Sequence, residues 1–336
     1  MMTETGMKDW RIGRWVAISA GLAVLVAAPV AYWAYQSTEE RVEGESAEPP
    51  SDVVDPEPFR VPELTFVEAD GSEAMLERLR ERGGEQWPPD AQVPPVTAAS
   101  FPDDLAEVDV QTRKEVFFRI LTPIVLAENA RLREAREFVA EVGERHEALE
   151  GAARERLEGL AAHYRVDLDD DGAIEELLRR LDEIPADMAV AQAANESGWG
   201  TSRFTRQANN LFGEWTWTQE EGLVPERRGE GETHRIRVFP SLQRSVRSYY
   251  FTLNVGHAYD ELRDLRARMR DEGGELDGEA LSAGLTAYSE RGEAYVEEVR
   301  SMIRFNELQR LNGLRLEDVE RQPTELAQAE AEADGE

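Results

Sequence analysis

The stretch PADMAVAQAANESGWGTSRFTRQANNLFGEWTW, residues 185–217, decides the fold because it joins a helix, a single acid at the helix end and a cluster of aromatic residues. Pro185 suits the first turn of a helix, where its missing N–H has no partner, and the alanine-rich run after it continues the helix. Small side chains let neighbouring helices approach closely. The helix is expected to break at Ser197-Gly198, which leaves Glu196 in or next to the last turn.

Glu196 is the candidate catalytic residue of this stretch. The negative end of the helix dipole opposes its ionisation, and Trp199 is placed to add a desolvating wall, so its pKa is expected to rise. A protonated carboxyl beside aromatic residues suits general-acid attack on a glycosidic bond. The competing interpretation is a solvated acid at a helix end, which is the usual fate of a lone Glu.

Four segments carry a resemblance to a known family. AQAANESGWGTSRF (191–204) and ANNLFGEW (208–215) resemble the bacterial peptidoglycan-lytic endo-beta-N-acetylglucosaminidases, in particular the Bax-type envelope proteins. The segments at 233–259 and 284–308 agree in the same order, and the resemblance spans about residues 111–311. It implies a mainly α fold, a lysozyme-like helical domain with a small β-hairpin lobe. It also implies that Glu196, in the E-S-x-W-G motif, is the catalytic acid and that Tyr288 lines the cleft.

The substrate implied by this resemblance is the glycan strand of peptidoglycan, cleaved at β-1,4 N-acetylglucosaminyl bonds in cell-wall remodelling. Such hydrolysis needs an acid for the leaving oxygen and a group that stabilises or captures the oxocarbenium ion. The second group stays open, because the 2-acetamido group of the substrate can serve as nucleophile. The acidic candidates, with Glu214 and Glu232 preferred, are Glu214, Glu226, Glu230 and Glu232.

Aromatic and amide side chains supply candidate sugar-binding residues. They are Trp199, Phe212, Trp215, Trp217 and Tyr288 for stacking, and Asn209 and Asn210 for hydroxyl or acetamido groups. Buried packing is the alternative for each aromatic ring, and Asn210 can equally bond the backbone of the turn before Leu211.

Composition narrows the class of function. The net charge of −31 excludes a nucleic-acid partner, which needs a basic face, and the absence of cysteine excludes disulfides and thiol catalysis. The four histidines form no metal-ligand motif. Residues 167–172 resemble the first half of a calcium loop, but Leu178 stands where the closing Glu is needed, which favours a helix-capping turn. No metal or cofactor is expected, and no protein partner is indicated.

The N-terminal part suggests a membrane anchor. Residues 1–14 carry three basic residues and are predicted to be cytoplasmic, and residues 15–35 hold no charge and are predicted to cross the inner (cytoplasmic) membrane. The catalytic domain would then lie in the periplasm. A cleaved signal is the alternative, because Ala27, Ala28 and Ala31 are small.

The remaining chain divides by composition. Residues 36–109 are rich in Pro and acidic residues and are predicted to be a largely disordered tether with one short helix at about 73–82. Residues 110–312 are predicted to form the glucosaminidase domain, with strands at 214–218 and 233–239 forming the hairpin. Residues 313–336 are predicted to be an acidic, disordered tail.

Three alternatives to a hydrolase stay open. A lytic transglycosylase also uses one acid on a lysozyme-like domain, and a wall amidase would attack the same polymer at its peptide. A non-catalytic wall-binding protein is the alternative from another class, although the retained Glu196 argues against it.

Overall fold

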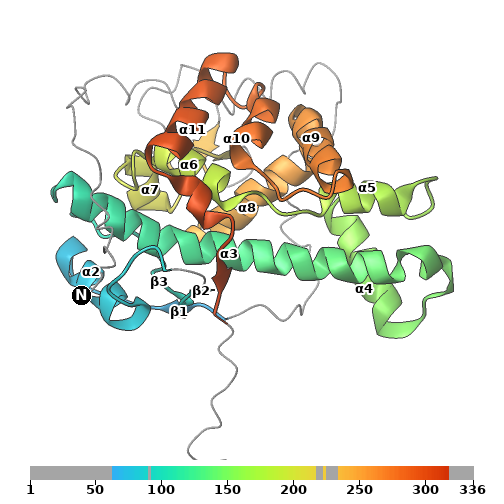
Figure 1. The fold of residues 1–336 in the computed structure, drawn as a ribbon, viewed down its shortest axis with the longest axis horizontal. Helices are drawn as coiled ribbons and strands as arrows, with labels where there is room; N and C mark the ends of the chain where they lie inside the picture. Colours follow the sequence, from blue (N-terminus) through green and yellow to red (C-terminus); the bar gives the residue numbers. More distant parts are fainter. Residues whose placement is uncertain (1–62, 90–91, 217–221, 225–233, 318–336) are drawn as a thin grey trace, which may run out of the picture.

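The computed structural model describes residues 63–89, 92–216, 222–224 and 234–317. These residues form a mainly helical body with a few two-residue strands, which confirms the prediction of a mainly α fold. The longest helix, α3 (Val110–Val142), crosses the molecule, with α2 and the short strands on one side and α6, α7 and α11 on the other (Figure 1). Asp109 begins α3 by accepting hydrogen bonds from the backbone N–H groups of Gln111 and Thr112.

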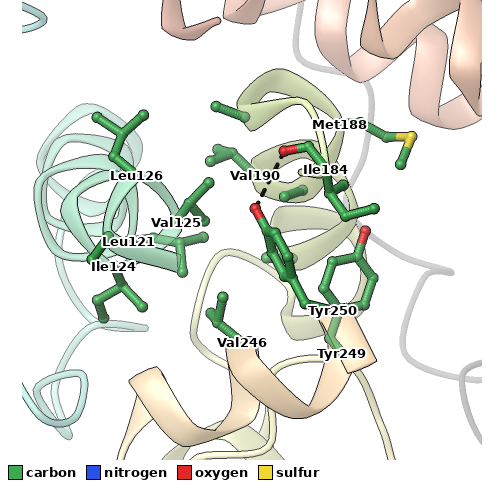
Figure 2. Packing of buried hydrophobic residues seen from close by; sticks show 14 of the residues in the cluster. Leu121, Ile124, Val125, Leu126, Ile184, Met188, Val190, Val246, Tyr249 and Tyr250 are labelled. Carbon is green, nitrogen blue, oxygen red and sulfur yellow. Dashed lines mark hydrogen bonds between the residues drawn. The ribbon is translucent and has the colours of Figure 1, made fainter. Parts of the chain in front are cut away.

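Helix α6 (Ala186–Ser197) occupies the centre of the body and carries the acid of the E-S-x-W-G motif. Nearly all of its residues are buried, because its alanines allow α3 to pack close to it, and α8 (Leu242–Val255) in turn packs on α3. Gly198 ends α6 with φ 57°, the left-handed conformation that a helix C-cap glycine commonly adopts. Apolar side chains of the three helices meet in one core, among them Leu121, Val125, Val190, Val246 and Tyr250 (Figure 2).

Six further helices complete the helical part of the described residues. They are α4 (Gly151–His163), α5 (Ala173–Arg180), α7 (Arg203–Ala208), α9 (Asp260–Asp271), α10 (Gly278–Leu281) and α11 (Glu293–Phe305). Short 3-10 segments join them: η2 (Gly143–Ala148), η3 (His257–Tyr259), η4 (Ser282–Leu285) and η5 (Leu308–Leu311). Gly172, at the end of the calcium-like sequence, has φ 80° and precedes α5, so this loop makes the expected turn before a helix.

The N-terminal segment, defined as residues 63–109, is folded where the sequence suggested a tether. It contains β1 (Thr65–Phe66), β2 (Gln92–Val93), β3 (Val96–Thr97) and α2 (Ser72–Gly83), the last close to the helix expected at 73–82. Its apolar residues enter the main core, so the predicted boundary at residue 110 falls inside the folded body. The buried members include Leu64, Val67, Met75, Leu76, Leu79, Val93, Phe101 and Leu105.

Two small sheets tie this segment into the body. β1 pairs in parallel with β3, and β2 pairs in parallel with β6 (Arg315–Leu316) near the end of the described chain. β6 lies within the stretch that was predicted to be an acidic tail. A third sheet is the expected hairpin, in which β4 (Trp215–Thr216) pairs antiparallel with β5 (Arg235–Ile236).

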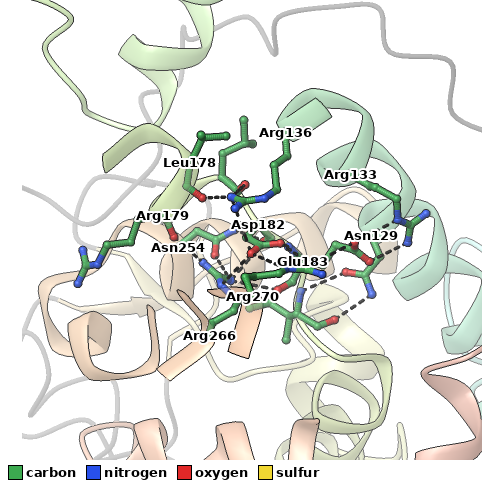
Figure 3. A network of polar contacts seen from close by, with 12 residues as sticks. Asn129, Arg133, Arg136, Leu178, Arg179, Asp182, Glu183, Asn254, Arg266 and Arg270 are labelled. Atoms are coloured by element: carbon green, nitrogen blue, oxygen red, sulfur yellow. Dashed lines mark hydrogen bonds and ion pairs between the residues drawn. The ribbon is translucent and has the colours of Figure 1, made fainter. Parts of the chain in front are cut away.

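A buried polar network closes the side of the body where α5 leads into α6. Asp182 accepts hydrogen bonds from Arg270 at 2.7 and 3.2 Å, and Arg266 donates to Asn254 Oδ1 at 2.7 Å (Figure 3). Burial opposes the charge of Asp182, but Arg266 and the other arginines outweigh it and lower its pKa. The paired charges therefore hold α9 against the turn that precedes α6.

The predicted location is corrected by the structure. A single-pass inner-membrane protein requires a helix that is long and apolar enough to cross a bilayer, and none of the helices in the described residues meets both conditions. Residues 1–14 and 15–35, on which the prediction of a cytoplasmic end, a membrane span and a periplasmic domain rested, lie outside the described residues.

Candidate active site

Glu196 stands in the last turn of α6, where a network of short bonds fixes the backbone. Ser197 Oγ donates to the carbonyl of Ala193 at 2.6 Å and accepts from the N–H of Gly200 at 2.8 Å. Gly198 caps the helix with a bond from its N–H to the carbonyl of Ala194. Glu196 as a whole residue is partly exposed.

Burial raises the pKa of Glu196 to about 7. Hydrogen bonds donated to its Oε1 by Tyr295, at 2.9 Å, and by Asn195, at 3.5 Å, oppose this rise. The effect of burial on the pKa is larger, because the free energy lost when a carboxylate leaves water exceeds the free energy gained from the two hydrogen bonds. A large fraction of Glu196 is therefore protonated at neutral pH, in agreement with the direction predicted from the sequence.

Four buried tyrosines surround this acid. Tyr249 comes from α8, Tyr259 from η3, Tyr295 from α11, and Tyr288 from the turn before α11. Burial raises the pKa of each, and the charge of Glu196 raises it further. Tyr288 and Tyr295 stack with ring centroids 5.2 Å apart. Tyr288 thus packs against the tyrosine that donates to Glu196, and its place in lining the cleft stays a prediction.

Gln192, Tyr249 and Tyr295 are site residues that the sequence analysis missed. Tyr249 Oη donates to Gln192 Oε1 at 2.5 Å, and Gln192 Nε2 donates to Tyr295 Oη at 3.0 Å. Tyr295 Oη then donates to Glu196 Oε1 at 2.9 Å. One signal was available for Gln192, because it lies four residues before Glu196 and therefore on the same face of the helix.

Glu214 is the second acid that the structure brings to this region. Ser248 Oγ donates to its Oε2 at 2.6 Å, and Arg237 Nη1 lies 3.5 Å from the same oxygen. Besides burial, the charge of Glu214 raises the pKa of Tyr259 and of Tyr288. The charge of Glu196 also acts on both of these tyrosines. The two carboxyl groups therefore act on a shared pair of buried tyrosines.

Asn209 and Asn210 form hydrogen bonds that hold the turn before Glu214. Asn210 Nδ2 donates to the carbonyls of Glu214, at 2.8 Å, and Arg237, at 2.9 Å, while its Oδ1 accepts from the N–H of Glu214 at 2.9 Å. Both amide protons of Asn210 are thereby used within the protein, which matches the alternative of backbone bonding rather than sugar binding. Asn209 ends α7 with φ 50° and donates to the carbonyl of Phe239 at 3.2 Å.

The Trp199 ring packs on α3. It contacts Phe117 and Phe118 with centroids 5.4 and 5.6 Å away, and Lys114 Nζ lies 4.2 Å from its centroid. The contribution of Trp199 to the burial of Glu196 stays a prediction.

Two other predicted aromatic residues, Phe212 and Trp215, stack on neighbouring rings. Phe212 is buried and stacks on Tyr249 at 3.9 Å, and Trp215 stacks on His234 at 4.0 Å at the base of the hairpin. Glu226, Glu230, Glu232 and Trp217 lie outside the described residues. Within the ranges that are described, no group of three or more His, Cys, Asp or Glu side chains is arranged to hold a metal ion.

Comparison with known proteins places this site in a family. The Glucosaminidase family, described as mannosyl-glycoprotein endo-beta-N-acetylglucosaminidase, matches residues 172–308, a range that includes Glu196, Glu214, Tyr288 and Tyr295. Protein bax of Escherichia coli (strain K12) is 30% identical over 214 residues, which are 62% of this chain and 76% of that protein. No solved structure matches the chain significantly. The family predicted from the four sequence segments is thus confirmed, and the chain belongs to the Bax-type proteins that carry a glucosaminidase domain.

Proposed function

We propose that this protein is a glycoside hydrolase that cleaves β-1,4 N-acetylglucosaminyl bonds of peptidoglycan, with Glu196 as the general acid. The glucosaminidase domain supports the class, a glycosidase that acts on a glycan such as peptidoglycan. The observation that carries the specific role is the pKa of about 7 that burial gives to Glu196, a residue that stays partly exposed. A carboxyl group with this pKa holds a proton at neutral pH and releases it to a leaving oxygen.

Glu196 would act on the oxygen of the glycosidic bond. Its proton moves to that oxygen as the bond to C1 breaks, and the bonding electrons leave with the oxygen. The sugar develops oxocarbenium character, which a second group must stabilise or capture.

Glu214 is the second group that we propose. A hydroxyl donor at 2.6 Å and a guanidinium at 3.5 Å suit an ionised carboxylate, whereas Glu196 lies in surroundings that favour the neutral acid. In glycoside hydrolysis, separate roles usually belong to two acids, one in surroundings that favour its neutral form and one in surroundings that favour its ionised form. The substrate's own acetamido group is the alternative nucleophile.

The fold that we propose is lysozyme-like. Its support is the helical body around α3 and α6, with the acid at the end of α6 and the β4–β5 hairpin beside the second acid. The same arrangement gives the hairpin the role of the wall opposite Glu196.

Substitution of Glu196 by Gln tests this function directly. Glu196→Gln keeps the shape and the hydrogen bond from Tyr295 but removes the proton, so turnover of purified peptidoglycan sacculi is expected to fall at least about 100-fold. Thermal unfolding of the variant checks that the fold is retained. Near-normal turnover by the folded variant would exclude Glu196 as the acid.

Mass spectrometry of the muropeptide products decides between the reactions. New reducing N-acetylglucosamine ends would support the proposed hydrolysis. Anhydro-muramyl ends would indicate a lytic transglycosylase, and released peptides would indicate an amidase. Binding without cleavage would indicate a wall-binding protein.

A further inference from the structure

Three hydrogen bonds in series connect helices α8, α6 and α11 and end on the carboxyl group of Glu196. They run from Tyr249 to Gln192 at 2.5 Å, from Gln192 to Tyr295 at 3.0 Å, and from Tyr295 to Glu196 Oε1 at 2.9 Å. Tyr249, Gln192 and Tyr295 are all buried, so water does not compete for these bonds. We refer to these three side chains as the relay.

Tyr249 fixes the orientation of the Gln192 amide. Its hydroxyl is buried, and its proton has Gln192 Oε1 as acceptor. A flipped amide would turn two N–H donors toward this hydroxyl and leave its proton without that acceptor, which is costly in a buried site. Gln192 therefore presents Nε2 to Tyr295.

The orientation of Gln192 then fixes the direction of the last bond. An amide N–H only donates, so Tyr295 Oη accepts from Gln192 and keeps its single proton for Glu196 Oε1. Asn195 Nδ2 donates to the same Oε1 at 3.5 Å. Glu196 Oε2 accepts no hydrogen bond from the described residues.

We propose that Gln192 and Tyr249 are positioning residues, which act through Tyr295 to keep the acidic proton of Glu196 on Oε2. Oε1 faces a donor in both protonation states, so a proton placed there would meet the Tyr295 hydroxyl proton head on. The inference rests on the proposed general-acid role and specifies which oxygen performs it.

The relay serves both stages of proton transfer. The bond between Oε2 and its proton breaks, a new O–H bond forms on the leaving oxygen, and the negative charge stays on the Glu196 carboxylate. Tyr295 already donates to that carboxylate, and a hydrogen bond to a charged acceptor is stronger than one to a neutral acceptor. The relay therefore directs the proton and stabilises the carboxylate left behind.

Other titratable groups also act on Glu196. The charge of Glu298 on α11 raises its pKa, and Arg291 in the turn before α11 lowers it. Tyr249, Tyr259 and Tyr288 face it from α8, from η3 and from the turn before α11, with pKa values raised mainly by burial. Tyr295→Phe and Gln192→Met leave all of these groups in place, so a change in titration would come from the relay itself.

The test uses two single variants and their combination in the full chain. Tyr295→Phe removes the donor, and turnover is expected to fall about tenfold while the falling limb of the pH profile moves above its wild-type position near pH 7. Gln192→Met should change both quantities in the same direction by a smaller amount. Because Gln192 acts through Tyr295, the combined variant should match Tyr295→Phe alone.

Titration of the Glu196 carboxyl carbon by ¹³C NMR gives a readout independent of turnover, with the signal assigned by its loss in Glu196→Gln. The Glu196 pKa should rise in Tyr295→Phe and in Gln192→Met. Tyr250→Phe is the matched control, because Tyr250 donates to the carbonyl of Ile184 at 3.3 Å and stands outside the relay. This control should leave the titration and the pH profile unchanged.

The outcomes separate the relay from the proposed function. Additive effects of Gln192→Met and Tyr295→Phe, or an unmoved Glu196 titration in Gln192→Met, would overturn the relay. A wild-type protein that cleaves no glycan but shows the expected titration shifts would overturn the proposed function and leave the relay standing. If Gln192→Met fails to fold, Gln192→Met combined with Tyr249→Phe removes both polar partners and serves in its place.

Discussion

Glu196 and Glu214 are the same residue type in opposite surroundings, and this difference gives each a testable role. Burial favours the neutral form of Glu196, with a pKa of about 7. Ser248 and Arg237 donate to Glu214 and suit its ionised form. A catalytic pair needs one neutral acid and one carboxylate. Two carboxylates would leave the leaving oxygen without a proton donor, and two neutral acids would leave the oxocarbenium ion without a negative charge.

Glu214→Gln is expected to reduce turnover of sacculi at least about 100-fold, because the amide can neither capture nor balance the positive charge of the transition state. Glu290→Gln, which changes an exposed acid in the nearby Y-S-E-R-G segment, is the control and should retain activity. Normal turnover by Glu214→Gln would transfer the nucleophile's role to the acetamido group of the substrate.

Asp187 gives a prediction about stability. It is fully buried, its Oδ2 has no hydrogen-bond partner in the described part, and burial raises its pKa to about 6. Because the folded-state pKa lies above the unfolded value, the cost of the buried charge is complete above about pH 6 and disappears below about pH 4. Asp187→Asn is therefore expected to stabilise the protein by up to about 3 kcal/mol at pH 8.

Thermal unfolding of wild-type protein and Asp187→Asn at pH 8 and pH 4 measures this effect. The melting temperature should rise in the variant at pH 8, and the two proteins should melt together at pH 4. The Asn side chain keeps an oxygen for the N–H of Met188, which donates to Asp187 Oδ1 at 2.7 Å. An equal change at both pH values would show that the buried charge is not the cause.

Sequence reasoning found the acid of this site but not the residues that position it. Glu196 was identifiable because the helix, its glycine stop and the motif are local. Gln192 bonds to Tyr249 across 57 positions and to Tyr295 across 103, and no short pattern connects residues so far apart.

At the scale of elements, the N-terminal segment is the largest departure from expectation. Its prolines and acidic residues indicated a tether, and its strands are only two residues long, too short for a periodic signal. Contacts supplied by the body order it instead. Arg119 of α3 donates to the carbonyls of Gly84 and Glu85 at 2.7 and 2.8 Å, and Thr97 donates to the carbonyl of Ile120 at 2.6 Å.

Phe101 links this segment to the loop that follows Glu196. Its ring stacks on Phe117 at 5.4 Å and fills the space beside Gly200, where an added Cβ would meet it at 2.9 Å. Phe101→Ala should lower the free energy of unfolding by about 3–5 kcal/mol, measured by urea denaturation. Phe66→Ala removes an exposed ring from the same segment and should change it by less than about 0.5 kcal/mol. Equal effects would show that the Phe101 contact is not specific.

At the scale of the whole molecule, the folded body needs residues from both ends of the described chain. A variant that begins at residue 110 would lose the buried side chains of the N-terminal segment and the partner strand of β6. It is expected to lose its cooperative thermal transition, whereas a variant that begins at residue 63 should keep it. Calorimetry of both variants measures this. Equal melting temperatures would mean that the N-terminal segment does not contribute to the stability of the body.

The pairing of β2 with β6 also sets the order in which the protein can be completed during synthesis. Gln92 lies opposite Arg315, and the N–H of Glu317 donates to the carbonyl of Val93 at 2.9 Å. The ribosome exposes Val93 long before it adds the strand that covers it, so the body closes only after nearly all of the described chain has emerged. A nascent chain that stops before β6 leaves this buried valine in water. Such a fragment offers chaperones and proteases an apolar site that the finished protein conceals.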